Sequence, residues 1–124
     1  MIEALHVLVA WALVLSNAVA GAWCLVAWKK PTAESVYLEY SIGLAHGLFF
    51  IQGILGVILY NRLQQQASDF HLFYGFFSMA FVGFLYAYRY QLRESKLYYP
   101  SYSFGCLFLA GMALRTIYLP AIAI

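Results

Sequence analysis

Residues 36–60 read VYLEYSIGLAHGLFFIQGILGVILY, and this stretch decides the fold class. Its one formally charged side chain is Glu39. A transmembrane helix needs roughly 20 consecutive apolar residues, because the hydrocarbon core of a bilayer is about 30 Å thick and each helical residue rises about 1.5 Å. The stretch is therefore long enough and apolar enough to cross a membrane as one helix.

Three further segments have the same character, at residues 4–28, 70–90 and 101–119. A helix satisfies its own backbone hydrogen bonds, which is why it is the natural spanning structure in lipid. Short loops make sequential helices antiparallel neighbours. The sequence thus predicts an all-α protein, an integral membrane four-helix bundle of up-down-up-down topology that forms a single transmembrane domain over residues 1–124.

The composition of the whole chain agrees with a membrane protein. Of its 124 residues, 65% are hydrophobic and only 10% are charged, with a mean hydropathy of +0.76. Soluble domains carry about 25% charged residues. This composition excludes intrinsic disorder, a nucleic-acid-binding protein and a secreted disulfide scaffold, and we expect no separate soluble domain. Cys24 and Cys106 form no CxxC motif, and we expect no disulfide between them.

The distribution of positive charge predicts the orientation. The first and third loops hold five Lys and Arg residues, whereas the opposite side of the predicted bundle holds two. The positive-inside rule places the richer side in the cytoplasm. We therefore expect a multi-pass protein of the inner or plasma membrane, surrounded by lipid, with both termini on the outer side. The richer set is Lys29, Lys30, Arg89, Arg93 and Lys96, and the poorer set is Arg62 and Arg115.

Three polar side chains from three predicted helices share one level near the outer interface: His6, His71 and Arg115. Ionisable residues inside membrane spans are costly and are candidates for functional sites. Gly75 and Ser78 follow His71 on its own helical stripe, where small residues would leave a slot between helices. A flat macrocycle ligated by His6 and His71 would fit this slot, and Arg115 could neutralise carboxylates at its edge. Arg62 is a second candidate for that role.

Each of these residues also has a purely structural interpretation. Histidines in the first turn of a spanning helix are often interfacial and hydrated, and Arg115 could extend to the interface as an anchor. We expect Asn17 and Gln52 to form hydrogen bonds between helices.

His46 lies in the second predicted helix, closer to the cytoplasmic side of the predicted bundle than His6 and His71. Gly43 and Gly47 form a GxxxG pattern beside it, which predicts close helix packing. His46 is then expected to donate to a backbone carbonyl of a neighbouring helix. The alternatives are an axial ligand to a second haem or a pigment, or a contact to a quinone headgroup.

Two short motifs resemble the haem A synthase family. Residues 3–6 read EALH at the start of an apolar helix, which is similar to the ExxH of that family. Residues 52–56 read QGILG and precede His71, as in its QxxLG…H succession. The resemblance covers roughly residues 3–90 and implies that His6 and His71 ligate a b-type haem near the outer face. That family has eight spans and this chain four, so haem modification is not implied. Four-helix cytochrome b561-like proteins are a looser analogy.

Two functions from different classes follow. The first is a small membrane protein that binds a b-type haem for electron transfer or haem handling. The second is a cofactor-free accessory subunit of a larger respiratory or photosynthetic membrane complex, with other membrane subunits or a second copy as partner. No Ser-His-Asp arrangement, HExxH motif or phosphate-binding loop is visible in the sequence.

Overall fold

The computed structural model describes residues 1–62 and 69–118, and every regular element within those ranges is a helix. The prediction of an all-helical fold is confirmed. The elements in chain order are α1 (Ile2–Lys29), the single 3₁₀ turn η1 (Pro31–Ala33), α2 (Val36–Arg62), α3 (Asp69–Ala87), α4 (Arg89–Glu94) and α5 (Tyr98–Tyr118).

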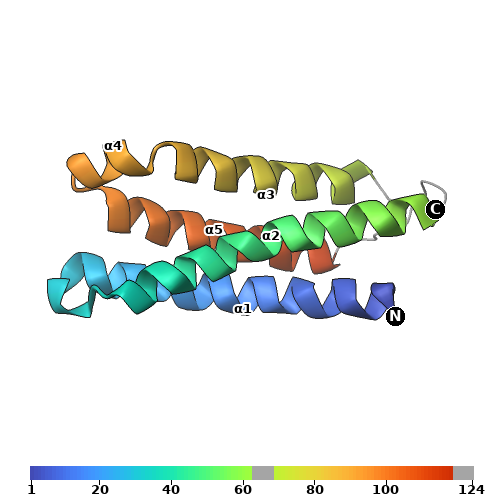
Figure 1. The fold of residues 1–124 in the computed structure, drawn as a ribbon, viewed down its shortest axis with the longest axis horizontal. Coiled ribbons are helices and arrows are strands. Elements are labelled where there is room, and N and C mark those ends of the chain that lie inside the picture. The colour runs from blue at the N-terminus through green and yellow to red at the C-terminus, as the bar shows by residue number, and fades with distance from the viewer. Residues whose placement is uncertain (63–68, 119–124) are drawn as a thin grey trace.

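The four long helices lie alongside one another, with their axes roughly aligned (Figure 1). α1 and α2 are joined by η1 at one end of the molecule, and the short α4 lies at that same end between α3 and α5. α5 therefore finishes at the end of the molecule where α1 begins (Figure 1). This second end contains the first turns of α1 and α3. It also contains the last turns of α2 and α5.

Three of the described helices, α1, α2 and α3, are long and apolar enough to cross a membrane. α1 and α2 contain 28 and 27 residues, and α3 contains 19. At about 1.5 Å per residue, even α3 approaches the thickness of a hydrocarbon core. The predicted fourth span, 101–119, corresponds to α5, whose described part is more polar; the last residue of that prediction lies outside the described residues.

The described surface of the molecule carries many large apolar side chains, as is typical of proteins that contact lipid. Phe76 is 73% exposed and Phe84 is 59% exposed on α3, for example. Soluble monomers rarely expose contiguous apolar surface on this scale. The interior instead holds Leu38 and Leu109 together with polar and sulfur-containing side chains, and both cysteines are buried free thiols.

α1 and α5 approach each other closely at Gly21. A Cβ atom added to Gly21 would lie 2.7 Å from the Leu107 Cγ atom, which is too close for any real side chain. The Ser103 hydroxyl donates a 2.9 Å hydrogen bond to the Gly21 carbonyl at the same crossing. Small residues at such crossings let two backbones pack tightly in a membrane protein.

The third predicted span is too long at its carboxyl end. The sequence predicts that this segment continues to Tyr90. In the structure α3 ends at Ala87, and a new helix, α4, begins at Arg89. Lys96 then adopts a left-handed conformation with φ of 63°, which turns the chain toward α5. Such conformations end helices because they satisfy the last carbonyl groups, and Leu97 donates from its backbone N–H to the Leu92 carbonyl here.

Candidate functional site

The rings of His6 and His71 lie close together at one end of the molecule. Their centroids are 6.2 Å apart and their planes are inclined by 52°. His6 stands in the first turns of α1 and His71 in the first turn of α3, and both side chains are partly buried. The two histidines that the sequence places at a common level are thus neighbours in the structure.

A side-chain hydrogen bond fixes the backbone of His6. The Gln52 Nε2 atom in α2 donates to the His6 carbonyl over 2.9 Å. In the same way the Asn17 Nδ2 atom bridges α1 and α2 by donating to the Ala45 carbonyl over 3.3 Å. The predicted hydrogen bonds between helices are therefore confirmed for Gln52 and Asn17.

Small residues lie next to His6 and along the helical stripe that follows His71. A Cβ atom added to Gly56 in α2 would lie 3.5 Å from the Cε1 atom of His6, an ordinary van der Waals distance. A Cβ atom added to Gly75, one turn below His71, would meet no described atom within 4 Å. Ser78, on the same stripe of α3, is buried. Gly75 lies on an exposed part of α3.

One nitrogen atom of this site lacks a hydrogen-bonding partner. The Nδ1 atom of His6 is buried and has no hydrogen bond among the described residues. A buried polar atom without a partner costs about 1–3 kcal/mol, and most such atoms in proteins are satisfied. The His6 ring therefore has the capacity to bind a further group.

Two arginines stand at the same end of the molecule as the histidines. Arg115 lies in the last turn of α5 and Arg62 in the last turn of α2, and both side chains are exposed. An exposed position at a helix end is compatible with a role as an interfacial anchor as well as with contact to an anionic group.

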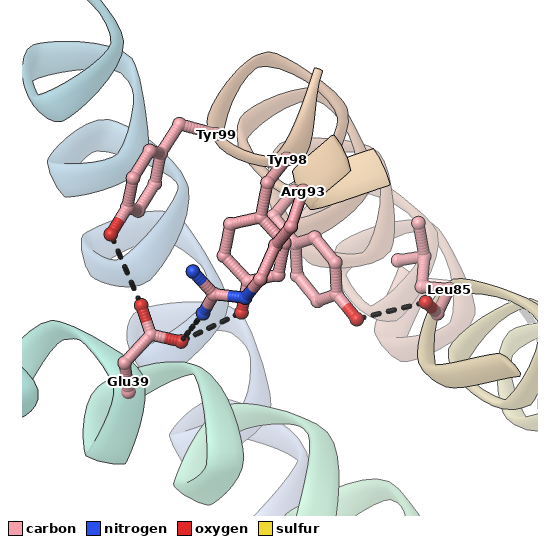
Figure 2. Close-up of polar contacts among 6 residues, drawn as sticks. Glu39, Leu85, Arg93, Tyr98 and Tyr99 are labelled. Carbon is pink, nitrogen blue, oxygen red and sulfur yellow. Dashed lines mark hydrogen bonds and ion pairs between the residues drawn. The ribbon is translucent and has the colours of Figure 1, made fainter. Parts of the chain in front are cut away.

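The opposite end of the molecule contains a polar cluster centred on Glu39 of α2 (Figure 2). Its Oε1 atom accepts hydrogen bonds from the Tyr98 hydroxyl over 2.7 Å and from the Arg93 guanidinium over 2.9 Å. Its Oε2 atom accepts a 3.2 Å hydrogen bond from the Tyr99 hydroxyl. One carboxylate thus joins α2 to α4 and to the beginning of α5.

Arg93 also stacks on an aromatic ring within this cluster. Its guanidinium carbon lies 3.7 Å from the centroid of the Tyr98 ring. Desolvation opposes its charged form, but the electrostatic influence of Tyr98 and then of Glu39 raises the pKa of Arg93 overall. The guanidinium therefore stays charged, as the ion pair with Glu39 requires.

His46 has a different partner from the backbone carbonyl that the sequence predicts. Its Nε2 atom lies 3.4 Å from the Cys106 Sγ atom of α5. Its ring stacks on Tyr102, with centroids 5.7 Å apart. The Tyr102 hydroxyl in turn donates to the Leu85 carbonyl over 2.9 Å (Figure 2). His46 belongs to a buried chain of contacts that links α2, α5 and α3.

The prediction that Gly43 and Gly47 pack closely against another helix is wrong. A Cβ atom added to either glycine would meet no described atom within 4 Å. Both glycines line a cavity of about 480 Å³ instead. Close packing of α2 against α3 occurs farther along, at Gly53, where an added Cβ would lie 2.7 Å from the Met79 Sδ atom.

Sequence reasoning missed the role of Glu39. Glu39 is the one carboxylate in the apolar stretch 36–60. This could have indicated its role, because a carboxylate within a membrane span is costly unless it is paired with hydrogen-bond donors or a positive charge. Its partners Arg93, Tyr98 and Tyr99 lie far away in the sequence, so only the fold identifies them.

The described residues contain no group of three or more His, Cys, Asp or Glu side chains placed to hold a metal ion. Comparison of the chain with protein-family models, with curated proteins and with solved structures gives no match.

Proposed function

We propose that this chain is a four-span integral membrane protein that binds a b-type haem between His6 of α1 and His71 of α3. The separation of 6.2 Å between the two ring centroids carries the proposal. At this separation the two imidazoles could hold one haem between them, each through a ring nitrogen.

The residues around the two rings fit such a group. Histidines on facing helices of a bundle can hold a haem, and His6 and His71 are the residues that would hold it here. The buried Nδ1 atom of His6 indicates a ring that still needs a polar or metal partner. Gly75 places no side chain on the helical stripe that follows His71, so no side chain at that position would obstruct a flat group.

The chain's own contribution is to hold and shield the site. Gln52 fixes the position of His6 through its backbone carbonyl, and Ser78 lies buried on the stripe below His71. Bound haem supplies one-electron redox chemistry, and burial together with hydrogen bonds to the ligands sets its potential. Arg115 and Arg62 are the candidates for pairing with carboxylates at the edge of the ring, because both lie at this end of the molecule.

The membrane orientation is part of the proposal. Three helices, α1, α2 and α3, have the length and apolarity of membrane spans. We include α5 as the fourth span because it lies beside them with its axis roughly aligned with theirs (Figure 1). The five positive side chains of the first and third loops favour the cytoplasm for that end. Both termini and the two histidines then lie toward the outer side of the inner or plasma membrane. Electron transfer or haem handling would take place there.

An absorption spectrum of the purified full chain in mild detergent tests this function. We expect a low-spin haem spectrum in the oxidised and reduced protein, with one haem per chain. His6→Ala and His71→Ala should each remove it, whereas His46→Ala, which alters a histidine remote from the site, should keep it. A spectrum lost only in His46→Ala, or a colourless protein from haem-sufficient cells, would overturn the proposal.

The second candidate is a cofactor-free accessory subunit of a larger respiratory or photosynthetic membrane complex. The observation that favours it is the face of α3, where Phe73, Phe76 and Phe84 are all more than half exposed. Such a surface is suited to another membrane subunit or a second copy as well as to lipid. A colourless preparation that co-purifies in a fixed ratio with larger membrane subunits would favour this candidate.

A further inference from the structure

A second site lies near the end of the molecule opposite the paired histidines. It is a cavity of about 480 Å³ between α2 and α3, with the first turns of α5 as its floor. Ligand pockets for small molecules have volumes of about 300–1,000 Å³ and are mostly apolar with a few polar groups. The rise of α2 between His46, in this cavity, and Gly56, beside His6, is about 15 Å, so the two sites are separate.

Three glycines keep the cavity open. Gly43 and Gly47 of α2 and Gly83 of α3 line it, and a Cβ atom added to any of them would meet no described atom within 4 Å. The helices therefore stand apart here, in contrast to the tight contact between Gly53 and Met79 farther along the same pair. Most of the residues that line the space are apolar, aromatic or glycine.

His46 is a polar residue in the wall of the cavity and is only 8% exposed. Its Nε2 atom faces the Cys106 thiol over 3.4 Å. A thiol that donates to Nε2 leaves the proton of the neutral imidazole on Nδ1, because a neutral ring carries one N–H. Nδ1 can then donate to an acceptor in the cavity. An ionisable side chain in a span is expensive and marks a functional site by default.

The remaining walls suit a flat ring with polar edges. The aromatic side chains of Phe50, Tyr86, Tyr98 and Tyr102 line the cavity. Arg89 lies at its rim, with its guanidinium carbon 3.8 Å from the centroid of the Tyr86 ring. Aromatic rings prefer other rings as stacked or edge-on neighbours. The cavity thus offers ring surfaces together with two donors, the imidazole and the guanidinium.

The neighbouring carboxylate does not compete for these donors. Glu39 also borders the cavity, but it already accepts hydrogen bonds from Arg93, Tyr98 and Tyr99. These bonds hold the rim of the cavity by tying α2 to α4 and α5.

We propose that this cavity binds the headgroup of a membrane quinone, with His46 Nδ1 donating to one carbonyl oxygen and Arg89 donating to the other. A quinone combines a flat ring, two carbonyl acceptors and an apolar tail, which matches the ring walls, the two donors and the apolar opening. A lipid acyl chain would fill the same volume but needs neither donor. The inference rests on the membrane placement in the proposed function and is independent of haem binding.

The test uses the purified full chain in detergent, with decylubiquinone and menaquinone-4 as probes and dodecane as an acyl-chain mimic. A ligand that binds the folded protein stabilises it by an amount that grows with the logarithm of its concentration divided by its Kd, and so raises its unfolding temperature. We expect at least one quinone, but not dodecane, to stabilise the protein. Gly83→Leu, which fills the cavity and removes no polar group, should weaken quinone binding at least tenfold, as should His46→Leu.

Gly111→Leu is the matched control, because Gly111 of α5 lies outside the cavity lining and an added Cβ there also meets no described atom within 4 Å. It should bind quinone as the unmodified protein does. Equal stabilisation by dodecane, no stabilisation by either quinone, or unchanged quinone binding in Gly83→Leu would overturn the inference. Haem content measured on the same samples separates the two proposals, because unmodified protein that contains haem but binds neither quinone would contradict this inference alone.

Discussion

The imidazoles of His6 and His71 lie with their centroids 6.2 Å apart, although α2 separates their two helices in the sequence. At this separation the two rings would be able to hold one haem between them. The relationship depends on the antiparallel return of α2, which brings the first turns of α1 and α3 to the same end (Figure 1). It is the feature from which the proposed haem site follows.

Gln52 should influence haem binding without touching the haem. Gln52→Leu removes the 2.9 Å hydrogen bond to the His6 carbonyl and leaves the apolar volume of the side chain in place. Changes to groups that orient metal ligands typically cost 10- to 100-fold in affinity, and we expect about tenfold here because the contact is to backbone. Transfer of haem from the protein to excess apomyoglobin measures this effect. Gln91→Leu, on the exposed side of α4, is the control and should retain haem normally.

Glu39 should stabilise the end of the molecule that contains α4. Glu39→Gln removes the charge that Arg93, Tyr98 and Tyr99 recognise, with little change in shape. Hydrogen bonds to a charged group are worth about 1.5–3 kcal/mol when buried, but Glu39 is partly exposed and exposed ion pairs contribute little. We therefore expect a loss of about 1–2 kcal/mol in the free energy of unfolding.

Thermal unfolding in detergent measures this loss, and Glu94→Gln is its control. Glu94 is an exposed carboxylate at the end of α4, and its substitution should change the stability by less than about 0.5 kcal/mol. Equal destabilisation by the two substitutions would contradict a specific role for Glu39.

Gly21, the single glycine of α1, should not tolerate a larger side chain. Gly21→Val places methyl groups against Leu107, where even a Cβ atom would lie 2.7 Å from Cγ. Overpacking of this kind costs about 1–3 kcal/mol and should also disturb the Ser103 hydrogen bond to the Gly21 carbonyl. Unfolding in detergent again provides the measurement, with Gly111→Val as control because its position is open. Similar stabilities of the two variants would mean that α1 and α5 are packed differently.

Hydropathy was sufficient to predict the long helices, because a run of apolar residues of spanning length has few alternatives to a helix. The pairing of His6 with His71 also followed from the sequence, since both lie in the first turn of helices that begin at one end. The break at Tyr88 did not follow, because residues 84–90 continue the aromatic character of α3 without a glycine or proline.

The cavity beside His46 could not be predicted from the sequence. A GxxxG pattern indicates that two small residues, here Gly43 and Gly47, lie on one face of a helix. It does not indicate whether a neighbouring helix fills the space above them. In this fold the neighbour is α3, and it supplies Gly83 at the facing position, so the space stays open. The partners of Glu39 were equally hidden, because the break after α3 decides where Arg93 lies.

Electron paramagnetic resonance of the oxidised full chain tests the proposed pairing of His6 and His71 most directly, because the signal reports the axial ligands of ferric haem. The account predicts a low-spin signal typical of two axial imidazoles, which either His6→Ala or His71→Ala converts to a high-spin signal or abolishes. A low-spin signal that survives either substitution, or a protein that takes up no haem, would contradict it.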